Sequence, residues 1–303
     1  MTNWAENKEL PTGYFRLWLL LKVYKFFGRR VLKIVIFPII LFSFFFMKAI
    51  RKASKEYFYT LYQYTKDKRL KPSLKNTFKH LYSFAESLLD KVAAWAGDIK
   101  NASLIYEDKE ATTEFIKTSK AKNGMFILSS HLGNVEVLRA LALDEFKDTV
   151  MNVFMDTART QSFNSFLEKT NPDSKLNLWS TSDINMETAF LTKDRLDNGE
   201  VFVMSADRVS ASNRKDVVER IFIGKQAKFP IGAFKFAKMM EVDLCFLAIC
   251  YGSNKQYHVY LNYYKYEQKM KLDDIINNYA GWLENLTIQH PYQWYNFYKF
   301  WND

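Results

Sequence analysis

Apolar residues recur at two different spacings along this 303-residue chain. Between residues 54 and 101 they recur at helical spacing, with Pro72 and Ser73 marking a helix start. After Asn123 and Gly124, short apolar runs alternate with amphipathic stretches. This alternation is typical of strand-helix-strand units, and it predicts an α/β fold with a mixed, largely parallel sheet flanked by helices.

The apolar runs after residue 124 also place the individual elements. The predicted strands are Met125–Ser129, Val150–Met155, Lys175–Trp179, Val201–Ser205, Val217–Ile223, Asp243–Ile249 and Tyr257–Tyr263. The predicted helices are Gly133–Leu143, Ser162–Thr170, Met186–Asp197, Gly232–Met240 and Leu272–Gln289. The chain therefore divides near residue 105, into a helical region over residues 1–105 and an α/β domain over residues 106–303.

Positive charge is concentrated in the N-terminal region. The chain carries a net charge of +10, yet residues 1–80 alone hold 17 Lys and Arg against 4 Asp and Glu, a net of +13. The same region contains the most apolar run of the chain, Ile34–Met47, with basic residues on both sides. Basic residues beside continuous apolar surface suit an anionic membrane, and the negative remainder of the chain argues against a nucleic-acid partner.

The apolar run Ile34–Met47 contains Pro38 and is shorter than the ~20 residues of a spanning helix. A second apolar stretch, Tyr14–Phe27, precedes it, and the two are predicted to form a helical hairpin in the membrane surface. The basic flanks predict a place on the cytoplasmic face of the inner membrane, held peripherally or by this short apolar helix. A buried core helix with a solvated basic face is the alternative for this region.

Several catalytic classes lose their strongest support because their motifs are absent. The sequence has no G-x-S-x-G, no phosphate-binding or dinucleotide-binding glycine motif, no H-E-x-x-H and no paired C-x-x-C. Cys245 and Cys250 lie in or next to an apolar stretch and are interpreted as core residues. No metal site is predicted. Three of the four histidines, His80, His258 and His290, lie in unremarkable surroundings.

The fourth histidine, His131, follows a buried strand and precedes a glycine. The carboxyl ends of strands are where α/β folds place their sites. Glu136 is five residues further on, about 140° around an ideal helix, so the two side chains meet only if His131 lies on the loop before the helix. Glu136 then fixes the imidazole tautomer, and the amides of Gly133 and Asn134 stabilise an oxyanion. A capping histidine beside a surface glutamate is the alternative.

A series of segments in a fixed order makes the chain recognisable. They are His131-Leu-Gly-Asn-Val-Glu136, Arg159, Asp207-Arg208, Phe222–Gly232 and Trp294–Trp301. In order and spacing they resemble the late lipid A biosynthesis (lauroyl/myristoyl) acyltransferase branch of the lysophospholipid acyltransferase superfamily, over roughly residues 10–303. The resemblance implies a glycerolipid acyltransferase-like fold and an enzyme that moves a fatty acyl chain from a thioester of acyl carrier protein or coenzyme A to a lipid hydroxyl, with no further cofactor.

The resemblance also implies roles for individual residues. His131 is the general base and Glu136 is its orienting partner. The residues expected at the head-group site are Arg159, Asp207 and Arg208. The residues expected in the segment that shapes the acyl pocket are Phe222, Gly224 and Pro230.

Two departures from the family pattern bear on the acceptor. Ile231 stands where the glycerophospholipid-acylating branch has an acidic residue, which argues against a glycerol-phosphate acceptor. Arg208 stands where the lipid A enzymes usually have glutamine, similar to a sub-branch associated with glycolipid and aryl polyene pathways. The expected acceptor is therefore a membrane glycolipid such as a lipid A precursor or an aryl polyene lipid. A non-catalytic membrane or lipid-carrier protein that retains the fold is the alternative function.

Overall fold

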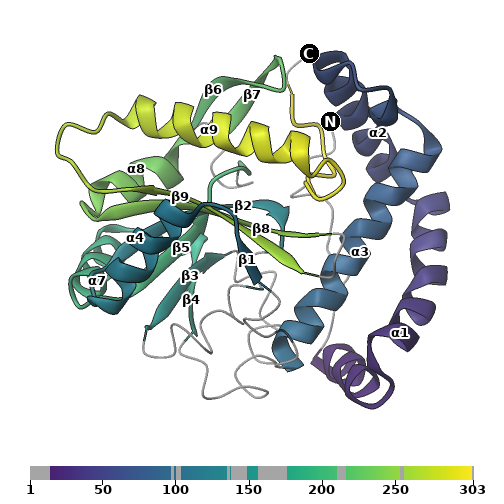
Figure 1. Ribbon diagram of the computed structural model, residues 1–303, viewed down its shortest axis with the longest axis horizontal. Coiled ribbons are helices and arrows are strands. Elements are labelled where there is room, and N and C mark those ends of the chain that lie inside the picture. Colours follow the sequence, from purple (N-terminus) through teal and green to yellow (C-terminus); the bar gives the residue numbers. More distant parts are fainter. Residues whose placement is uncertain are drawn as a thin grey trace.

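The computed structural model describes residues 14–96, 99, 104–134, 137, 149–155, 176–209, 216–252 and 256–301. The described chain begins with three helices, α1 (Tyr14–Phe46), α2 (Lys48–Thr65) and α3 (Leu74–Ala96). These helices gather along one side of the molecule (Figure 1). The remaining elements form an α/β unit against them.

The α/β unit is built on a seven-stranded sheet with the strand order β1-β9-β8-β2-β5-β3-β4. Its strands are β1 (Leu104–Tyr106), β2 (Met125–Gly133), β3 (Met151–Met155), β4 (Leu176–Ser180), β5 (Val201–Ser205), β8 (Asp243–Tyr251) and β9 (Tyr257–Tyr264). Only β8 and β9 pair antiparallel, whereas the other neighbours run parallel. This confirms the predicted α/β class with a mixed, largely parallel sheet flanked by helices.

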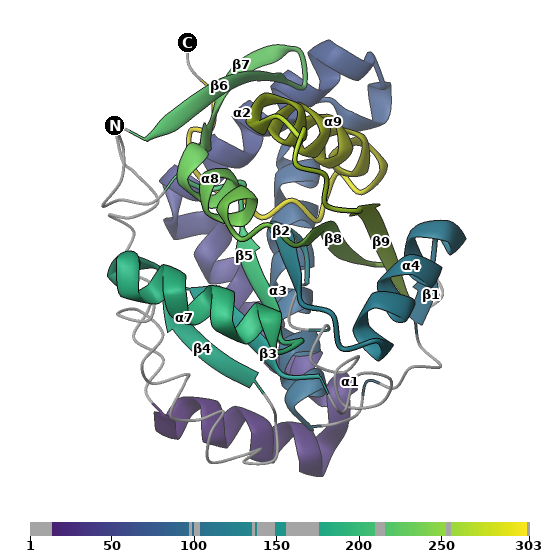
Figure 2. The same ribbon diagram turned by 90° about the vertical axis from the view of Figure 1, so that its left-hand side faces the viewer.

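The helices of the α/β unit are α4 (Lys109–Lys120), α7 (Met186–Asp197), α8 (Ile231–Met239) and α9 (Leu272–Gln289). Helices α7, α8 and α9 pack on one face of the sheet, and in Figure 2 they lie along its upper side, with α9 above β8 and β9. A separate antiparallel hairpin, β6 (Val217–Phe222) and β7 (Lys225–Pro230), precedes α8.

The predicted elements match the observed ones with a few corrections. Six of the seven predicted strands end within two residues of the observed bounds, and α7, α8 and α9 are confirmed. The short strand β1, the helix α4 and the strand β7 were not predicted. The helix predicted to begin at Gly133 is wrong there, because β2 continues to Gly133, which pairs with Ile249 of β8. The helix predicted over 162–170 lies outside the described residues.

Side chains of β2 alternate between two cores, one on each face of the sheet. Phe126 and Leu128 belong to a core shared with α2, α8 and α9. Met125 and Ile127 point to the opposite core, shared with α1, α3 and α4. A strand buried on both faces reads as a continuous apolar run, which is why β2 was found from its sequence. Both predicted core cysteines are fully buried free thiols.

Helix α1 joins the two predicted N-terminal apolar stretches, with a break in its helical backbone at Gly28, where φ is +73°. A residue other than glycine is strained at this angle. Beyond the break, one side of α1 buries Leu32, Ile40 and Phe44. No single helix in the described part of the chain has the length and hydropathy of a membrane span. The segments 21–46 and 48–65, bent by 85°, meet that test only as a pair.

Candidate active site

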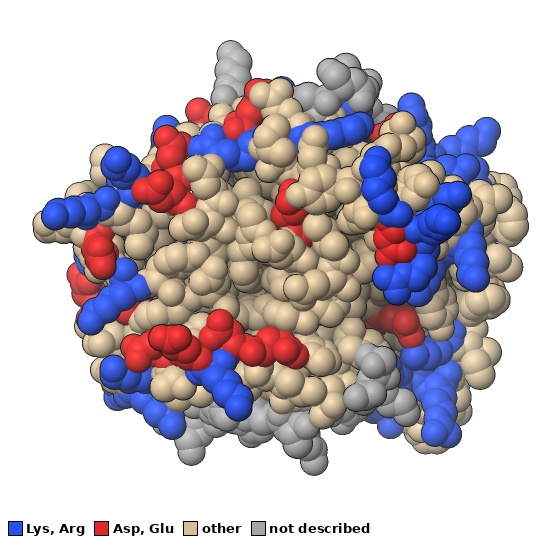
Figure 3. Space-filling model, turned by 45° about the horizontal axis from the view of Figure 1, so that its top comes forward, with Lys and Arg blue, Asp and Glu red and all other residues tan. Residues whose placement is uncertain are grey.

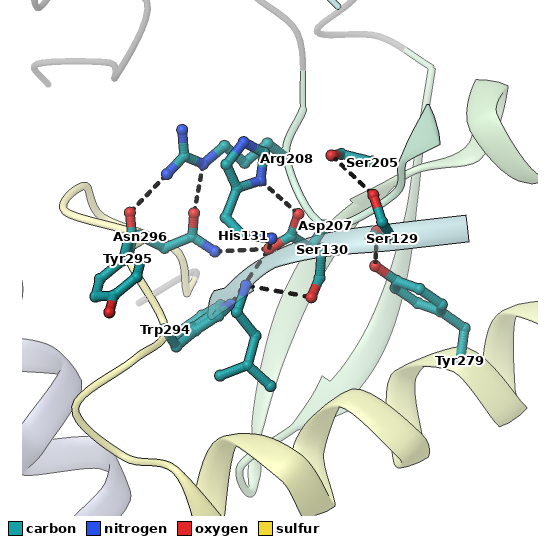
Figure 4. A network of polar contacts seen from close by, with 11 residues as sticks. Ser129, Ser130, His131, Ser205, Asp207, Arg208, Tyr279, Trp294, Tyr295 and Asn296 are labelled. Atoms are coloured by element: carbon teal, nitrogen blue, oxygen red, sulfur yellow. Dashed lines mark hydrogen bonds and ion pairs between the residues drawn. The ribbon is translucent and has the colours of Figure 1, made fainter. Parts of the chain in front are cut away.

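The candidate site forms where two adjacent parallel strands end. Strands β2 and β5 pair in a register that sets Ser129 opposite Ser205. His131 and Asp207 each come two residues later, so the register brings them to the same point at the carboxyl edge of the sheet. Figure 4 shows the two side chains facing each other there. This edge is where α/β folds place their sites.

Asp207 holds His131 by two hydrogen bonds. Its Oδ1 lies 2.7 Å from His131 Nδ1, and its Oδ2 accepts from the backbone N–H of His131 at 3.0 Å. Oδ2 also accepts from Trp294 Nε1 at 3.3 Å and from Asn296 Nδ2 at 3.1 Å. An ionised carboxylate only accepts hydrogen bonds, so Nδ1 of His131 carries the proton. The lone pair of the neutral ring is therefore on Nε2, to which no residue in the described ranges bonds.

The surroundings keep His131 neutral and Asp207 charged. Burial lowers the pKa of His131, and the positive charges of Arg208 and Lys91 lower it further, against the raising effect of Asp207. About a third of the His131 side chain, 34%, is nevertheless exposed. Burial alone would raise the pKa of Asp207, but electrostatic attraction to the His131 ring, the hydrogen bonds that His131 donates and the charge of Arg208 outweigh it and lower that pKa to about 2. Such a pair can act as a general base near neutral pH.

Arg208 contributes positive charge directly beside this pair. Its Nε donates to Asn296 Oδ1 at 2.5 Å, and its Nη2 donates to the carbonyl oxygen of Tyr295 at 2.6 Å. The guanidinium is half-buried and stands close to the imidazole in Figure 4. A fixed cation next to a base can stabilise negative charge that develops on a reacting oxygen.

The two backbone amides expected to form an oxyanion hole donate instead to carbonyl oxygens of the protein. Gly133 donates to the carbonyl oxygen of Gln293 at 2.8 Å, and Asn134 donates to that of Ile249 at 2.8 Å. The expectation for these amides is therefore wrong, because they bond to the segment after α9 and to β8 and do not lie at the free end of a helix. Gly133 is required structurally: its φ is +72°, and a Cβ there would lie 1.9 Å from the oxygen of Ile249. Asn134 is buried and its side chain donates to Ser87 of α3.

The remaining predicted site residues are not all brought together. Glu136 and Arg159 lie outside the described residues. Phe222 is fully buried, and its ring lies 5.2 Å from that of Trp294. It therefore packs against a residue that bonds to Asp207, and does not bond to the dyad itself. Gly224 lies in the turn between β6 and β7, and Pro230 ends β7 at the start of α8. Asp207 was expected at the head-group site, whereas the structure buries it completely behind His131.

Sequence reasoning missed the part played by the segment after α9. Trp294 bridges to Leu132 in an antiparallel sense, and the N–H of Tyr295 donates to the carbonyl oxygen of His131 at 3.1 Å. Trp294 and Asn296 then reach Asp207 with their side chains. The family resemblance had included Trp294–Trp301 without a role, and no local pattern in this segment indicates contact with a strand end far away in the sequence.

His80 of α3, predicted to be unremarkable, supports this segment. It is buried, and its Nε2 lies 2.9 Å from the carbonyl oxygen of Trp294 while its Nδ1 lies 3.0 Å from the hydroxyl of Ser54. A carbonyl only accepts, so Nε2 is the protonated nitrogen and Nδ1 accepts from the serine. Burial lowers the pKa of His80 to about 4, which keeps this arrangement neutral. His80 thus joins the N-terminal helices to the site.

The described residues define an α/β protein with a histidine–carboxylate dyad, flanked by an arginine, where two parallel strands of a mixed sheet end. Within the described ranges, no group of three or more His, Cys, Asp or Glu side chains is arranged to hold a metal ion. No protein-family model matches the chain, and no curated protein sequence matches it.

Proposed function

We propose that this protein is an O-acyltransferase that moves a fatty acyl chain from a thioester of acyl carrier protein or coenzyme A to a hydroxyl of a membrane glycolipid. The observation that carries the proposal is the pairing of His131 with buried Asp207, which leaves the lone pair on Nε2, with no bond from any described residue, at a partly exposed edge. The sequence resemblance to the late lipid A acyltransferases supports the choice of reaction. It also supports a lipid A precursor or an aryl polyene lipid as the acceptor class.

The proposed reaction uses three groups of the site. Nε2 of His131 takes the proton from the acceptor hydroxyl, and the oxygen attacks the thioester carbonyl. Asp207 stabilises the imidazolium that forms, and Arg208 stabilises the oxyanion of the tetrahedral intermediate. The carbon–sulfur bond then breaks, the thiolate takes the proton from Nε2, and the ester and the free thiol leave. In this scheme Asp207 has the orienting role that the sequence analysis gave to Glu136.

The pH dependence of transfer tests the role of His131. The base acts only when neutral, and its pKa is lowered from the usual 6.5. Activity should therefore be level at neutral pH and fall as the pH drops through an apparent pKa below 6.5. Asp207, with a pKa of about 2, stays ionised throughout. The measurement is kcat/KM for transfer from an acyl thioester to a lipid extract between pH 4.5 and 8. An acid limb centred above pH 7 would contradict this assignment.

We also propose that α1 attaches the protein to an anionic membrane surface. Its outer side exposes large apolar side chains, among them Phe26 (83%), Ile34 (72%) and Phe42 (63%). The opposite side packs against the protein through Leu32, Ile40 and Phe44. The part of α1 after Lys33 contains no charged residue, so it is apolar on both sides, as helices covered on all sides are. Figure 3 shows Lys and Arg side chains gathered at the right of the view, where Figure 1 has the N-terminal helices. Apolar surface flanked by basic residues suits acidic lipid head groups.

Substitution of these three residues tests the membrane proposal. The combined Phe26→Glu, Ile34→Glu and Phe42→Glu variant should bind vesicles of anionic phospholipid at least about 100-fold more weakly, because each loses about 1.5 to 3 kcal/mol of apolar burial. Co-sedimentation with vesicles measures this.

The matched control carries the same charge at three similarly exposed apolar residues elsewhere, Met186→Glu, Phe190→Glu and Ile221→Glu. Equal vesicle binding by the α1 variant and this control would refute the proposed attachment.

A further inference from the structure

The side-chain amide of Asn296 stands between the two charged groups of the site. Its Nδ2 donates to Oδ2 of Asp207 at 3.1 Å, and its Oδ1 accepts from Nε of Arg208 at 2.5 Å. Asn296 is 2% exposed, so these contacts are not exchanged with water. Figure 4 shows the amide reaching the carboxylate on one side and the guanidinium on the other.

The partners leave only one orientation for this amide. A carboxylate offers no hydrogen, so the nitrogen of Asn296 must face Asp207, and a guanidinium accepts none, so the oxygen must face Arg208. Of the short side chains, only asparagine presents a donor and an acceptor on one planar group. Aspartate offers two acceptors, and alanine offers neither.

A direct pair of Arg208 with Asp207 would be electrostatically favourable but unproductive for catalysis. A guanidinium and a carboxylate next to each other tend to form a direct bidentate pair. Such a pair would draw Asp207 away from Nδ1 of His131 and would turn Arg208 away from the imidazole. The amide satisfies both groups at once, so Asp207 remains bonded to His131.

We propose that Asn296 is a positioning residue that keeps Arg208 and Asp207 apart, so that the carboxylate stays on His131 and the guanidinium stays beside it. Its effect on catalysis rests on the proposed acyl transfer, whereas its effect on the state of His131 does not. The charged groups that act on His131 among the described residues are Asp207 and Arg208, which follow β5, and Lys91 of α3.

Two substitutions separate this role from simple support of the fold. Asn296→Asp adds a negative charge that pairs with Arg208 and repels Asp207, so the pKa of His131 should rise by about one pH unit. Asn296→Ala lets Arg208 pair with Asp207, so His131 loses its acceptor and its pKa should fall. A residue that only fills space would not shift the pKa of His131 in opposite directions.

The experiment is a titration of the imidazole signals of the full-length protein by NMR. The chain has four histidines, and the signal lost in His131→Gln assigns the relevant one. The control is Asn198→Asp, which makes the same change at an exposed helix end far from the site. Opposite shifts support the proposal, and shifts of the same sign or no shift beyond the control overturn it. If the Asp variant does not fold, a lowered pKa in the Ala variant supports the proposal, and an unchanged or raised one overturns it.

Activity measured in parallel keeps the two proposals distinguishable. If wild-type protein transfers acyl groups, Asn296→Ala should lower kcat/KM by about 10- to 100-fold with little change in KM. If the wild type transfers none while the imidazole shifts appear as expected, the positioning role stands and the proposed reaction fails.

Discussion

Asp207→Asn should lower kcat/KM for acyl transfer by about 10³- to 10⁴-fold. The four hydrogen bonds to Asp207 all need an acceptor, from Nδ1 and the backbone N–H of His131, from Trp294 and from Asn296. Nδ1 faces one carboxylate oxygen and the other three donors face the second. An amide has only one oxygen, so its N–H₂ group must face either Nδ1 or the other three donors. If the N–H₂ faces Nδ1, the imidazole takes the wrong tautomer, and if it faces the other donors, they lose their acceptor. Only the first orientation moves the proton onto Nε2, but both remove the negative charge that stabilises the imidazolium.

The control for this variant is Asp243→Asn. Asp243 also accepts two hydrogen bonds, from the hydroxyl of Tyr263 and the backbone N–H of Tyr266, but it lies at the beginning of β8 and away from the site. Its loss should affect stability and leave kcat/KM unchanged within a small factor. A folded Asp207→Asn protein that retains more than a tenth of wild-type activity would exclude Asp207 as the orienting group.

His131→Ala should lower kcat by at least about 10³-fold while the protein remains folded. The ring is partly exposed, so its removal costs little packing and leaves a gap that a small molecule can enter. Added imidazole should therefore restore part of the lost activity, with a dependence on the neutral form of imidazole. His258→Ala is the matched control, since His258 lies on β9, pairs with Glu107 and has no hydrogen bond to His131 or Asp207. Loss of activity that imidazole does not restore, together with a changed circular dichroism spectrum, would point to a structural role.

Local patterns sufficed for most strands of this fold, but not for which strands lie next to each other. The runs that become β2 and β5 are apolar because both faces of each strand are buried, and both were predicted to end at the observed register pair, Ser129 and Ser205. Which strands lie next to each other depends on contacts between distant segments. The prediction for β2 also ended too early, since the polar residues after Ser129 interrupt the apolar run while pairing with β8 continues to Gly133.

The dependence on contacts between distant segments also explains which site residues could be predicted and which could not. His131 could be found because a histidine directly after a buried strand is a local signal. Its partner was sought nearby, at Glu136, whereas the described carboxylate on Nδ1 is that of Asp207, 76 residues away. Asp207 and Arg208 were selected from the family resemblance, but their actual contacts follow from strand order. Asn296, 89 residues beyond Asp207, had no local signal at all.

The most direct test of this account is the transfer of a radiolabelled acyl chain from acyl carrier protein into a total bacterial lipid extract, corrected for thioester hydrolysis. Wild-type protein and His131→Ala are compared under the same conditions. The account predicts label in a lipid product with the wild type and almost none with the variant, and the product then identifies the acceptor. Equal transfer by both proteins would contradict His131 as the base. If neither protein transfers label but both bind lipid without a thioester, the result would instead favour a lipid carrier that retains the fold.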